Sequence, residues 1–428
     1  MISISLSAVV IIAALLFGAV YPWTMAITAF VAVAALMYFL WSTRGDVDTF
    51  AGGKGVVLLS LLLFSYPLFQ LVPLPVSMLG IIYPRFEELV SVTPKSPAFH
   101  SISIYPFATE METARLFIYL AVFFIAAFGL KDEEDADRVL KTLVAFGFFL
   151  SIFAIIQHAT WNGKIYWIKK PIHENASPYG TFINKNHFAG FIGMIIPFSI
   201  GIALRARRLE KKILFAFFGV TMTISLFFSL SRGGIISFFA GVLVFSLMVF
   251  MKGVSKKKLI PIILFSLVLA IYLLFLGVSP IIERFSQSEV SGLQRLTAWQ
   301  GTLSAFRDYS LLGSGLGTFR YIFKIYQPEG LYLYWTHAHN DYLELLLEFG
   351  IVGTFLVVIF LFTVLRRILK TDWQGRGLYI GAALLSSLTT IAVHSIVDFN
   401  LHIPSNAILF FLVLGIGVFM SRRSLSES

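Results

Sequence analysis

The stretch YLELLLEFGIVGTFLVVIFLFTVL, residues 342–365, decides the fold class. Only two of its side chains are charged, Glu344 and Glu348. A helix of about 20 mostly apolar residues is long enough to cross the hydrocarbon core of a bilayer. We therefore predict that this stretch is a membrane-spanning helix.

Eleven further stretches have the same character. Across the 428 residues, 57% are hydrophobic and only 13% are charged, whereas soluble domains carry roughly 25% charged residues. No soluble fold can bury that much apolar surface, so we predict an all-α polytopic membrane protein with about 12 transmembrane helices. The predicted spans are about 2–20, 24–41, 55–73, 113–130, 138–158, 187–204, 212–230, 233–251, 258–277, 342–365, 377–397 and 405–421.

The distribution of lysine and arginine predicts the orientation of the chain. With both termini in the cytoplasm, the short inside segments hold 20 basic residues and the much longer outside segments hold 13. This is the positive-inside pattern, and it explains the net charge of +10 without any nucleic-acid partner. The chain has no cysteine, so disulfides, iron–sulfur clusters and thiol nucleophiles are excluded.

Two outside segments are long, and we treat residues 1–428 as one integral membrane domain that carries them. Residues 74–112 form a proline-rich loop, and residues 278–341 form a larger, partly helical loop that we expect to cover the functional site. A helical spacing of apolar residues within the second loop predicts an amphipathic helix. The residues of this apolar face are Leu293, Leu296, Trp299, Leu303 and Phe306.

The segment Thr336–Asp341 lies where the larger loop re-enters the membrane. Asn340 is a plausible N-cap for the following span, which would place His339 just outside its first turn. Imidazole titrates near neutral pH, so His339 is a candidate general base, with a hydrogen-bonded interfacial histidine as the alternative. His337 and His339 could also ligate a metal, but no third ligand is evident, and we predict no metal and no cofactor.

Two acidic residues deeper in the same helix, Glu344 and Glu348, share a face with Asp341. An ionisable group at that depth is costly and needs a partner, so we favour structural support for them. The glycine-rich segment 313–317 lacks the spacing of a dinucleotide-binding loop, and we reject that function for it.

Three arginines on the predicted outer face could bind an anion. Arg232 departs from the positive-inside bias, and a guanidinium at an outer helix end can bind phosphate with two hydrogen bonds; contact with lipid phosphate is the alternative. Arg295 and Trp299 lie four residues apart on one helix face, which also fits a surface cation–π pair. Arg320 adds positive charge nearby.

Polar residues also gather at two other outer helix ends. The run Asn184, Lys185, Asn186 and His187 suits an anionic, sugar-bearing ligand, although Asn186 could simply cap a helix. Around the link between the last two spans lie His394, Asp398, Asn400, His402 and Asn406, for which a structural pairing is favoured over a proton relay.

Four of these segments together resemble the O-antigen ligase and O-antigen polymerase family. They are GTFINKNHFAGF (180–191), SRGG (231–234), RLTAWQ followed by GSGLGTF (295–319), and HAHNDYLELLLEFGIVG (337–353). The resemblance covers about residues 180–400. It implies a GT-C-like glycosyltransferase of the bacterial inner membrane that takes glycan from undecaprenyl pyrophosphate on the periplasmic side.

The resemblance also implies roles for residues. Arg232 and Arg295 would hold the pyrophosphate, and His339 would orient or deprotonate the acceptor hydroxyl in a metal-independent, inverting transfer. Substrate contacts are expected from Asn184, Lys185, Asn186, His187, Trp299, Arg320, His337 and Asn340.

The acceptor stays open between three chemistries that use the same donor. A ligase transfers the glycan to lipid A–core, a polymerase to another carrier-linked repeat, and an oligosaccharyltransferase to protein. A transporter of lipid-linked glycan is the alternative from a different class. It is disfavoured because the charged groups lie at the outer helix ends, and because no internal repeat is visible.

Overall fold

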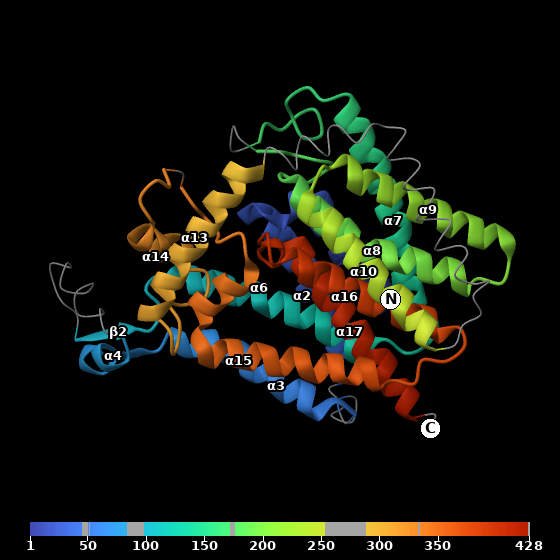
Figure 1. Cartoon of the computed structure of the whole chain (residues 1–428). Helices are drawn as coiled ribbons and strands as arrows, with labels where there is room; N and C mark the ends of the chain where they lie inside the picture. Colours follow the sequence, from blue (N-terminus) through green and yellow to red (C-terminus); the bar gives the residue numbers. More distant parts are fainter. Residues whose placement is uncertain are drawn as a thin grey trace. The chain divides into compact units, whose positions relative to one another are not determined.

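The computed structural model describes residues 1–44, 50, 52–83, 98–171, 176–252, 288–332 and 334–426. Over these residues the chain is an all-α polytopic membrane protein (Figure 1). Nine of the described helices are long and apolar enough to cross a membrane. They are α2 (Pro22–Thr43), α6 (Pro106–Phe124, continued by a π-helical turn to Gly129), α7 (Glu133–Ala159), α8 (Lys185–Arg205), α9 (Leu209–Phe228), α10 (Arg232–Met251), α15 (Asp341–Lys370), α16 (Gly377–His394) and α17 (Pro404–Ser426).

Two of the predicted spans are shorter helices, α1 (Ile2–Leu15) and α3 (Lys54–Gln70). The first of these ends at Leu15, and Phe17, Gly18 and Ala19 that follow all adopt positive φ and turn the chain. Helix α6 begins at Pro106 rather than near residue 113, as suits proline in the first turn of a helix. The predicted span 258–277 lies outside the described residues.

The chain divides into two compact units. Unit 1 comprises Met1–Thr49, Ala121–Gln287 and Arg367–Ser428, and unit 2 comprises Phe50–Leu120 and Ser288–Arg366.

Helix α8 is the central element of unit 1. It packs against α7, α9, α10, α16 and α17, and most of its surface is buried. A helix that is apolar on every side is expected in such a position. Helix α16 lies against both α8 and α10, and the Ser386 hydroxyl donates a hydrogen bond to the Gly241 carbonyl at 2.7 Å. This bond ties α16 to α10.

Unit 2 combines α3 and the start of α6 with smaller elements. These are β1 (Pro73–Pro75), α4 (Val76–Ile82), β2 (Phe99–Ser101), α13 (Ser288–Asp308) and α14 (Phe319–Tyr326), followed by α15 as far as Arg366. Strands β1 and β2 pair antiparallel, with Leu74 opposite His100. Side chains from α4, α13, α14 and α15 share one apolar core, which includes Leu79, Ala305, Phe323 and Leu347.

Helix α13 confirms the helix expected in the larger loop, but it is buried through a different face. Leu293, Leu296 and Leu303 of the expected apolar face are exposed. Ala298 and Ala305 are fully buried instead. Small side chains let α13 approach its neighbours closely, so the face that carries alanines is buried and the face that carries leucines is exposed.

Candidate functional site

The N-terminus of α15 fixes the segment that carries both candidate histidines. We call residues 335–340 the histidine loop. Asn340 caps the helix as expected, because its Oδ1 accepts hydrogen bonds from the backbone N–H groups of Tyr342 at 3.0 Å and Leu343 at 3.1 Å. These bonds satisfy two of the donors that every helix start leaves open. The histidine loop is therefore attached rigidly to α15.

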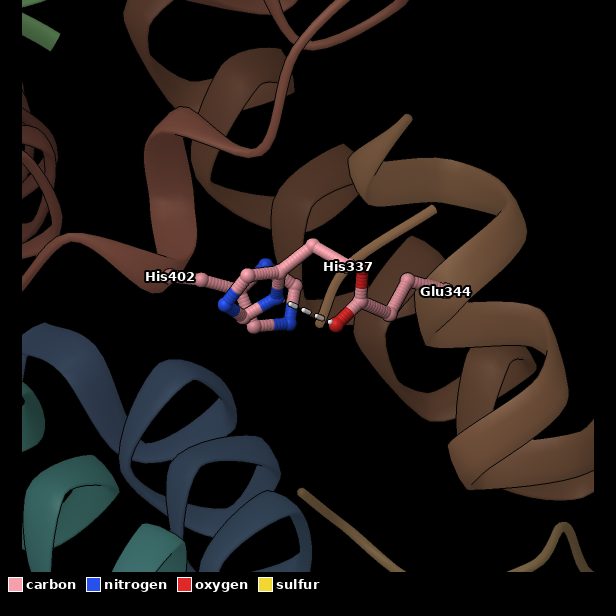
Figure 2. Close-up of side chains that lie close together, drawn as sticks. All are labelled: His337, Glu344 and His402. Atoms are coloured by element: carbon pink, nitrogen blue, oxygen red, sulfur yellow. Dashed lines mark hydrogen bonds and ion pairs between the residues drawn. The ribbon is translucent and has the colours of Figure 1, made fainter. Parts of the chain in front are cut away.

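Glu344, one turn into α15, reaches back to the same loop. Its Oε1 lies 2.8 Å from Nδ1 of His337 (Figure 2). Its Oε2 accepts a hydrogen bond from the backbone N–H of Ala338 at 2.8 Å. The Glu344 side chain is 1% exposed, whereas that of His337 is 28% exposed. A buried carboxylate thus supports a partly exposed imidazole.

Helix α13 holds the loop from another direction. The indole Nε1 of Trp299 donates a hydrogen bond to the carbonyl of Ala338 at 3.0 Å. The ring of His339 packs edge-on against Trp335, with centroids 5.5 Å apart, and its backbone adopts a positive φ of 52°. A positive φ is uncommon outside glycine and marks a backbone that its surroundings hold in place.

Helix α15 is interrupted at Gly350, which adopts φ 63° and ψ −172°. Several of the backbone groups released by this break find partners in unit 2. The N–H groups of Ile351 and Val352 donate to the carbonyls of Ser310 and Leu311, at 2.8 and 3.2 Å. A break in a helix of a membrane protein is tolerated where the protein itself satisfies the backbone in this way.

The carbonyls freed by the break accept hydrogen bonds from the glycine-rich segment 313–317 and from α3. Glu348 O accepts from Gly315 N at 3.1 Å and from the side-chain amide of Gln70 at 2.8 Å. Phe349 O accepts from the Tyr66 hydroxyl at 2.8 Å. We call the glycine-rich segment 313–317 the splint, because its backbone N–H groups bond to carbonyls that the break in α15 leaves open.

Two more side chains secure this splint. The Glu348 carboxylate accepts hydrogen bonds from the backbone N–H groups of Gly317 at 2.8 Å and Phe319 at 2.9 Å, at the start of α14. The Tyr83 hydroxyl donates to the Gly313 carbonyl at 2.9 Å. Burial raises the pKa of Tyr83 far above its usual value, so its phenol remains a neutral donor.

The two candidate arginines of unit 2, Arg295 and Arg320, lie on different helices. Arg295 is half-buried on α13, one turn before Trp299. Arg320 is exposed on α14, where it lies over the ring of Tyr321 at 4.8 Å and donates a hydrogen bond to the Tyr321 hydroxyl at 2.8 Å.

In unit 1, the run from Asn184 to His187 forms the start of α8. Its cap is Asn184 and not Asn186: the Asn184 Oδ1 accepts from the backbone N–H of Asn186 at 2.9 Å. The backbone N–H of Lys185 donates to the carbonyl of Ser177 at 2.7 Å. Asparagine at the cap position leaves Asn186 inside the first helical turn.

His187 lies in a buried polar cluster with the link between α16 and α17. Its Nε2 is 4.0 Å from Oδ1 of Asp398, and its ring packs edge-on against Phe399. The side-chain amide of Asn406 donates to the His187 carbonyl and to Oδ1 of Asn400, both at 3.0 Å. These contacts join the start of α8 to the link between α16 and α17, and a structural pairing of His394 with Asp398 stays a prediction.

Arg232 is the first residue of α10 and is half-buried. The Ser231 hydroxyl caps this helix by accepting from the backbone N–H of Gly234 at 3.2 Å. A Cβ on Gly233 would lie 2.8 Å from the imidazole of His394, so α10 begins directly against the buried cluster. A helix N-terminus that carries an arginine is favourable for an anion.

The candidate residues thus fall into two groups, each well ordered by its own hydrogen bonds. Unit 2 carries Arg295, Trp299, Arg320, His337, His339 and Asn340, and unit 1 carries Asn184, Lys185, Asn186, His187 and Arg232. Sequence reasoning missed Gln70, Tyr66 and the glycine-rich splint as parts of the support. The recurrence of glycine in 313–317 together with Gly350 was the available signal.

Residues 217–358 match the family model described as O-antigen ligase. The matched stretch includes the start of α10, helix α13 and the histidine loop. No curated protein matches the chain. The family resemblance is confirmed over this stretch, and it supports a glycosyltransferase-type membrane enzyme of O-antigen ligation or polymerisation.

Proposed function

We propose that this chain, which carries the O-antigen ligase match over residues 217–358, transfers a glycan from undecaprenyl pyrophosphate to a sugar hydroxyl of lipid A–core. The observation that carries the proposal is the histidine loop inside the matched stretch, held by Asn340, Glu344 and Trp299. Such support keeps an imidazole in a fixed orientation, as a group that must meet an incoming hydroxyl requires. We place the reaction on the periplasmic side of the bacterial inner membrane, with both termini in the cytoplasm.

The arginines would act on the leaving group. As the bond between the anomeric carbon and the phosphate breaks, negative charge grows on the pyrophosphate oxygens. Arg232 and Arg295 would each supply a guanidinium, a group that binds such oxygens with two parallel hydrogen bonds. The transfer is then metal-independent, because fixed cations already neutralise the leaving group, and direct attack by the hydroxyl inverts the anomeric carbon.

His339 would orient or deprotonate the acceptor hydroxyl. Around it, Trp299, His337, Asn340 and Arg320 would contact the glycans. The Oδ1 atom of Asn340 already caps α15, so the group that would donate a hydrogen bond to a sugar oxygen is its amide NH₂.

The start of α8 would offer polar groups to a glycan in the same way. Asn184 caps α8 through its Oδ1, and its amide N–H groups are the ones that it offers to a sugar. Lys185 adds a positive charge, and Asn186 and His187 complete the substrate-contacting run.

Polymerisation of carrier-linked repeats is the alternative with the same donor, and the family match supports both acceptor chemistries equally. A transporter of lipid-linked glycan is the alternative from another class. It requires functional charges near the middle of the membrane, whereas Arg232 and the histidine loop lie at helix ends.

The test uses purified protein in nanodiscs with excess EDTA, undecaprenyl-pyrophosphate glycan as donor, and rough lipopolysaccharide as acceptor. Attachment of glycan to lipopolysaccharide is measured for the wild type, for His339→Ala and Arg232→Ala, and for the matched controls His158→Ala and Arg207→Ala on exposed residues. We expect transfer by the wild type and both controls and none by the two site variants. Growth of a glycan ladder on the donor alone would make the protein a polymerase. Passage of the donor across vesicle membranes without any glycan transfer would refute the proposed glycosyltransferase activity and support the transporter.

A further inference from the structure

A short loop follows α7 directly, and we call its residues 160–170 the tryptophan loop. Helix α7 is long and apolar enough to cross a membrane, and it ends at Ala159. Ile165 of the loop is fully buried in a cluster with the link between α1 and α2. The Tyr166 hydroxyl donates a hydrogen bond to the carbonyl of Leu15, the last residue of α1. The ends of three apolar helices therefore meet at this loop, which is where we expect the hydrocarbon of a bilayer to give way to headgroups.

The backbone of the tryptophan loop is held in a conformation that few residues adopt. Tyr166 and Trp167 are consecutive, and both have a positive φ, at 55° and 60°. Across them, Ile165 and Lys169 exchange two backbone hydrogen bonds of 2.8 and 3.0 Å. The indole Nε1 of Trp167 donates to the carbonyl of Thr160 at 3.2 Å. Backbone strain of this kind persists only where the surroundings fix it, and it is concentrated at functional sites.

This fixed backbone exposes apolar and basic side chains in one loop. Three large apolar side chains are exposed, namely Trp161, Trp167 and Ile168, and Ile168 is 79% exposed. The loop also carries three lysines, of which Lys169 and Lys170 are exposed. Tryptophan is enriched at membrane–water boundaries because its ring is apolar and its N–H is polar. The exposed apolar side chains therefore fit the boundary between acyl chains and headgroups.

The charge around the tryptophan loop is positive. The described segments that meet there, 13–24, 155–171 and 176–187, hold four lysines and no aspartate or glutamate. The positive-inside rule gathers lysine in cytoplasmic loops, whereas the orientation predicted from the sequence places this loop on the opposite face. Topology therefore does not account for these lysines, and their charge is complementary to an anionic ligand.

We propose that the tryptophan loop binds anionic phospholipid in the leaflet that it faces. The three exposed apolar side chains enter the boundary of the acyl chains, and the lysines bind the headgroup phosphates. Apolar burial and attraction to anionic headgroups act together in this way at membrane surfaces. A free phosphate ion would leave Ile168 in water, and a zwitterionic lipid would offer the lysines no net negative charge. An anionic phospholipid accounts for both features, and its binding does not depend on the proposed glycosyl transfer.

The first arm of the experiment tests whether the loop reaches the lipid. Because the chain has no cysteine, one fluorophore can be attached at a chosen position. Ile168→Cys carries it on the loop, and Glu329→Cys, at an exposed polar position, is the control. In nanodiscs that contain phosphatidylglycerol, quenching by aqueous iodide is compared with quenching by lipid that carries a nitroxide near the headgroup. We expect the label at 168 to be quenched by the lipid and protected from iodide, and the label at 329 to show the reverse.

The second arm measures what the lysines contribute. Dioctanoyl phosphatidylglycerol is titrated into protein labelled at 168 in an uncharged detergent. The titration is repeated with Lys169→Gln/Lys170→Gln and with the control Lys211→Gln/Lys212→Gln, which changes an exposed adjacent pair at the start of α9. A lysine near an anionic lipid surface strengthens binding about fivefold. The loop variant should therefore bind about 30-fold more weakly than the wild type, and the control variant should bind as the wild type does.

Several results would overturn the inference while leaving the proposed function standing. They are equal binding by the two lysine variants, equal binding of dioctanoyl phosphatidylcholine, and a label at 168 that iodide quenches as fully as the label at 329. Displacement of the lipid by an equal concentration of inorganic phosphate would assign the lysines to a free anion instead. Displacement by rough lipopolysaccharide at lower concentration would assign the loop to a glycolipid, and it too would overturn the proposal of a phospholipid.

Discussion

Replacing Gly313 by alanine tests whether the glycine-rich splint supports the broken helix. Gly313 adopts φ 78°, and a Cβ there would lie 2.2 Å from the carbonyl oxygen of Glu348 and 2.6 Å from the nitrogen of Gly350. Both neighbours are backbone atoms and cannot rotate away. Gly330 is the matched control, because it adopts φ 89° but a Cβ there meets nothing within 4 Å.

The expected magnitude follows from what the added methyl group displaces. Both variants incur the cost of a left-handed alanine, about 1–2 kcal/mol. Only Gly313→Ala also pushes the splint away from α15, where the hydrogen bonds from Ser314 N to Leu347 O and from Gly315 N to Glu348 O are 2.9 and 3.1 Å long. Leaving the groups of two buried bonds unsatisfied costs about 1–3 kcal/mol each. The difference between the variants should therefore be about 2–6 kcal/mol.

The assay is thermal unfolding of both variants in the same nanodiscs. At an unfolding entropy of about 2.1 cal/mol/K per residue, 428 residues shift by about 1 °C per kcal/mol, so Gly313→Ala should melt roughly 2–6 °C below Gly330→Ala. Equal melting temperatures would refute the view that the splint supports the break at Gly350. A loss of transfer without any loss of stability would also refute it, since that result would place Gly313 in contact with substrate.

Three further predictions concern other parts of the chain. Glu348→Ala removes the acceptor of the N–H groups of Gly317 and Phe319, and it should lower the free energy of unfolding by about 2–6 kcal/mol in denaturant titrations. Asn406→Leu removes two buried 3.0 Å hydrogen bonds of unit 1 and should cost a similar amount, whereas an unchanged midpoint would show that the polar cluster does not stabilise this unit. Burial raises the pKa of Tyr166 to about 12, so its contribution to stability is complete below pH 10 and is lost as the pH rises toward 12. Tyr166→Phe should weaken this alkaline loss of stability, measured as the melting temperature between pH 10 and 12.

The membrane helices were predictable because their signal is local. A run of apolar residues long enough to cross a bilayer identifies a span whatever its neighbours are, and such runs gave α8, α10 and α17 to within a few residues. The shortened α1 was not predicted. It is followed by Phe17, Gly18 and Ala19, which all adopt positive φ, and an apolar run does not reveal the φ that its residues adopt.

The site was predictable only where one residue acts on its own neighbours in the sequence. The cap at Asn340 and the support from Glu344 are of this kind, because both partners lie within one or two turns. The bonds from Gln70 to Glu348 and from Trp299 to Ala338 join residues that are far apart in the chain. Spacing within one sequence carries no signal for such contacts.

The break at Gly350 also explains how two buried acids can occupy a membrane helix. Before the break, Glu344 and Glu348 both accept hydrogen bonds from backbone N–H groups of unit 2. Glu344 bonds to the histidine loop, and Glu348 bonds to Gly317 and to the start of α14. After the break the surface of the helix changes, and Ile351, Phe355 and other large apolar side chains become exposed. The apolar run after the break, residues 351–365, rises about 22 Å at 1.5 Å per residue and ends at the basic residues Arg366 and Arg367. The part of α15 with large exposed apolar side chains therefore begins after Gly350, whereas Glu344 and Glu348 lie before it, where hydrogen bonds from backbone N–H groups of unit 2 offset the cost of burying an ionised side chain.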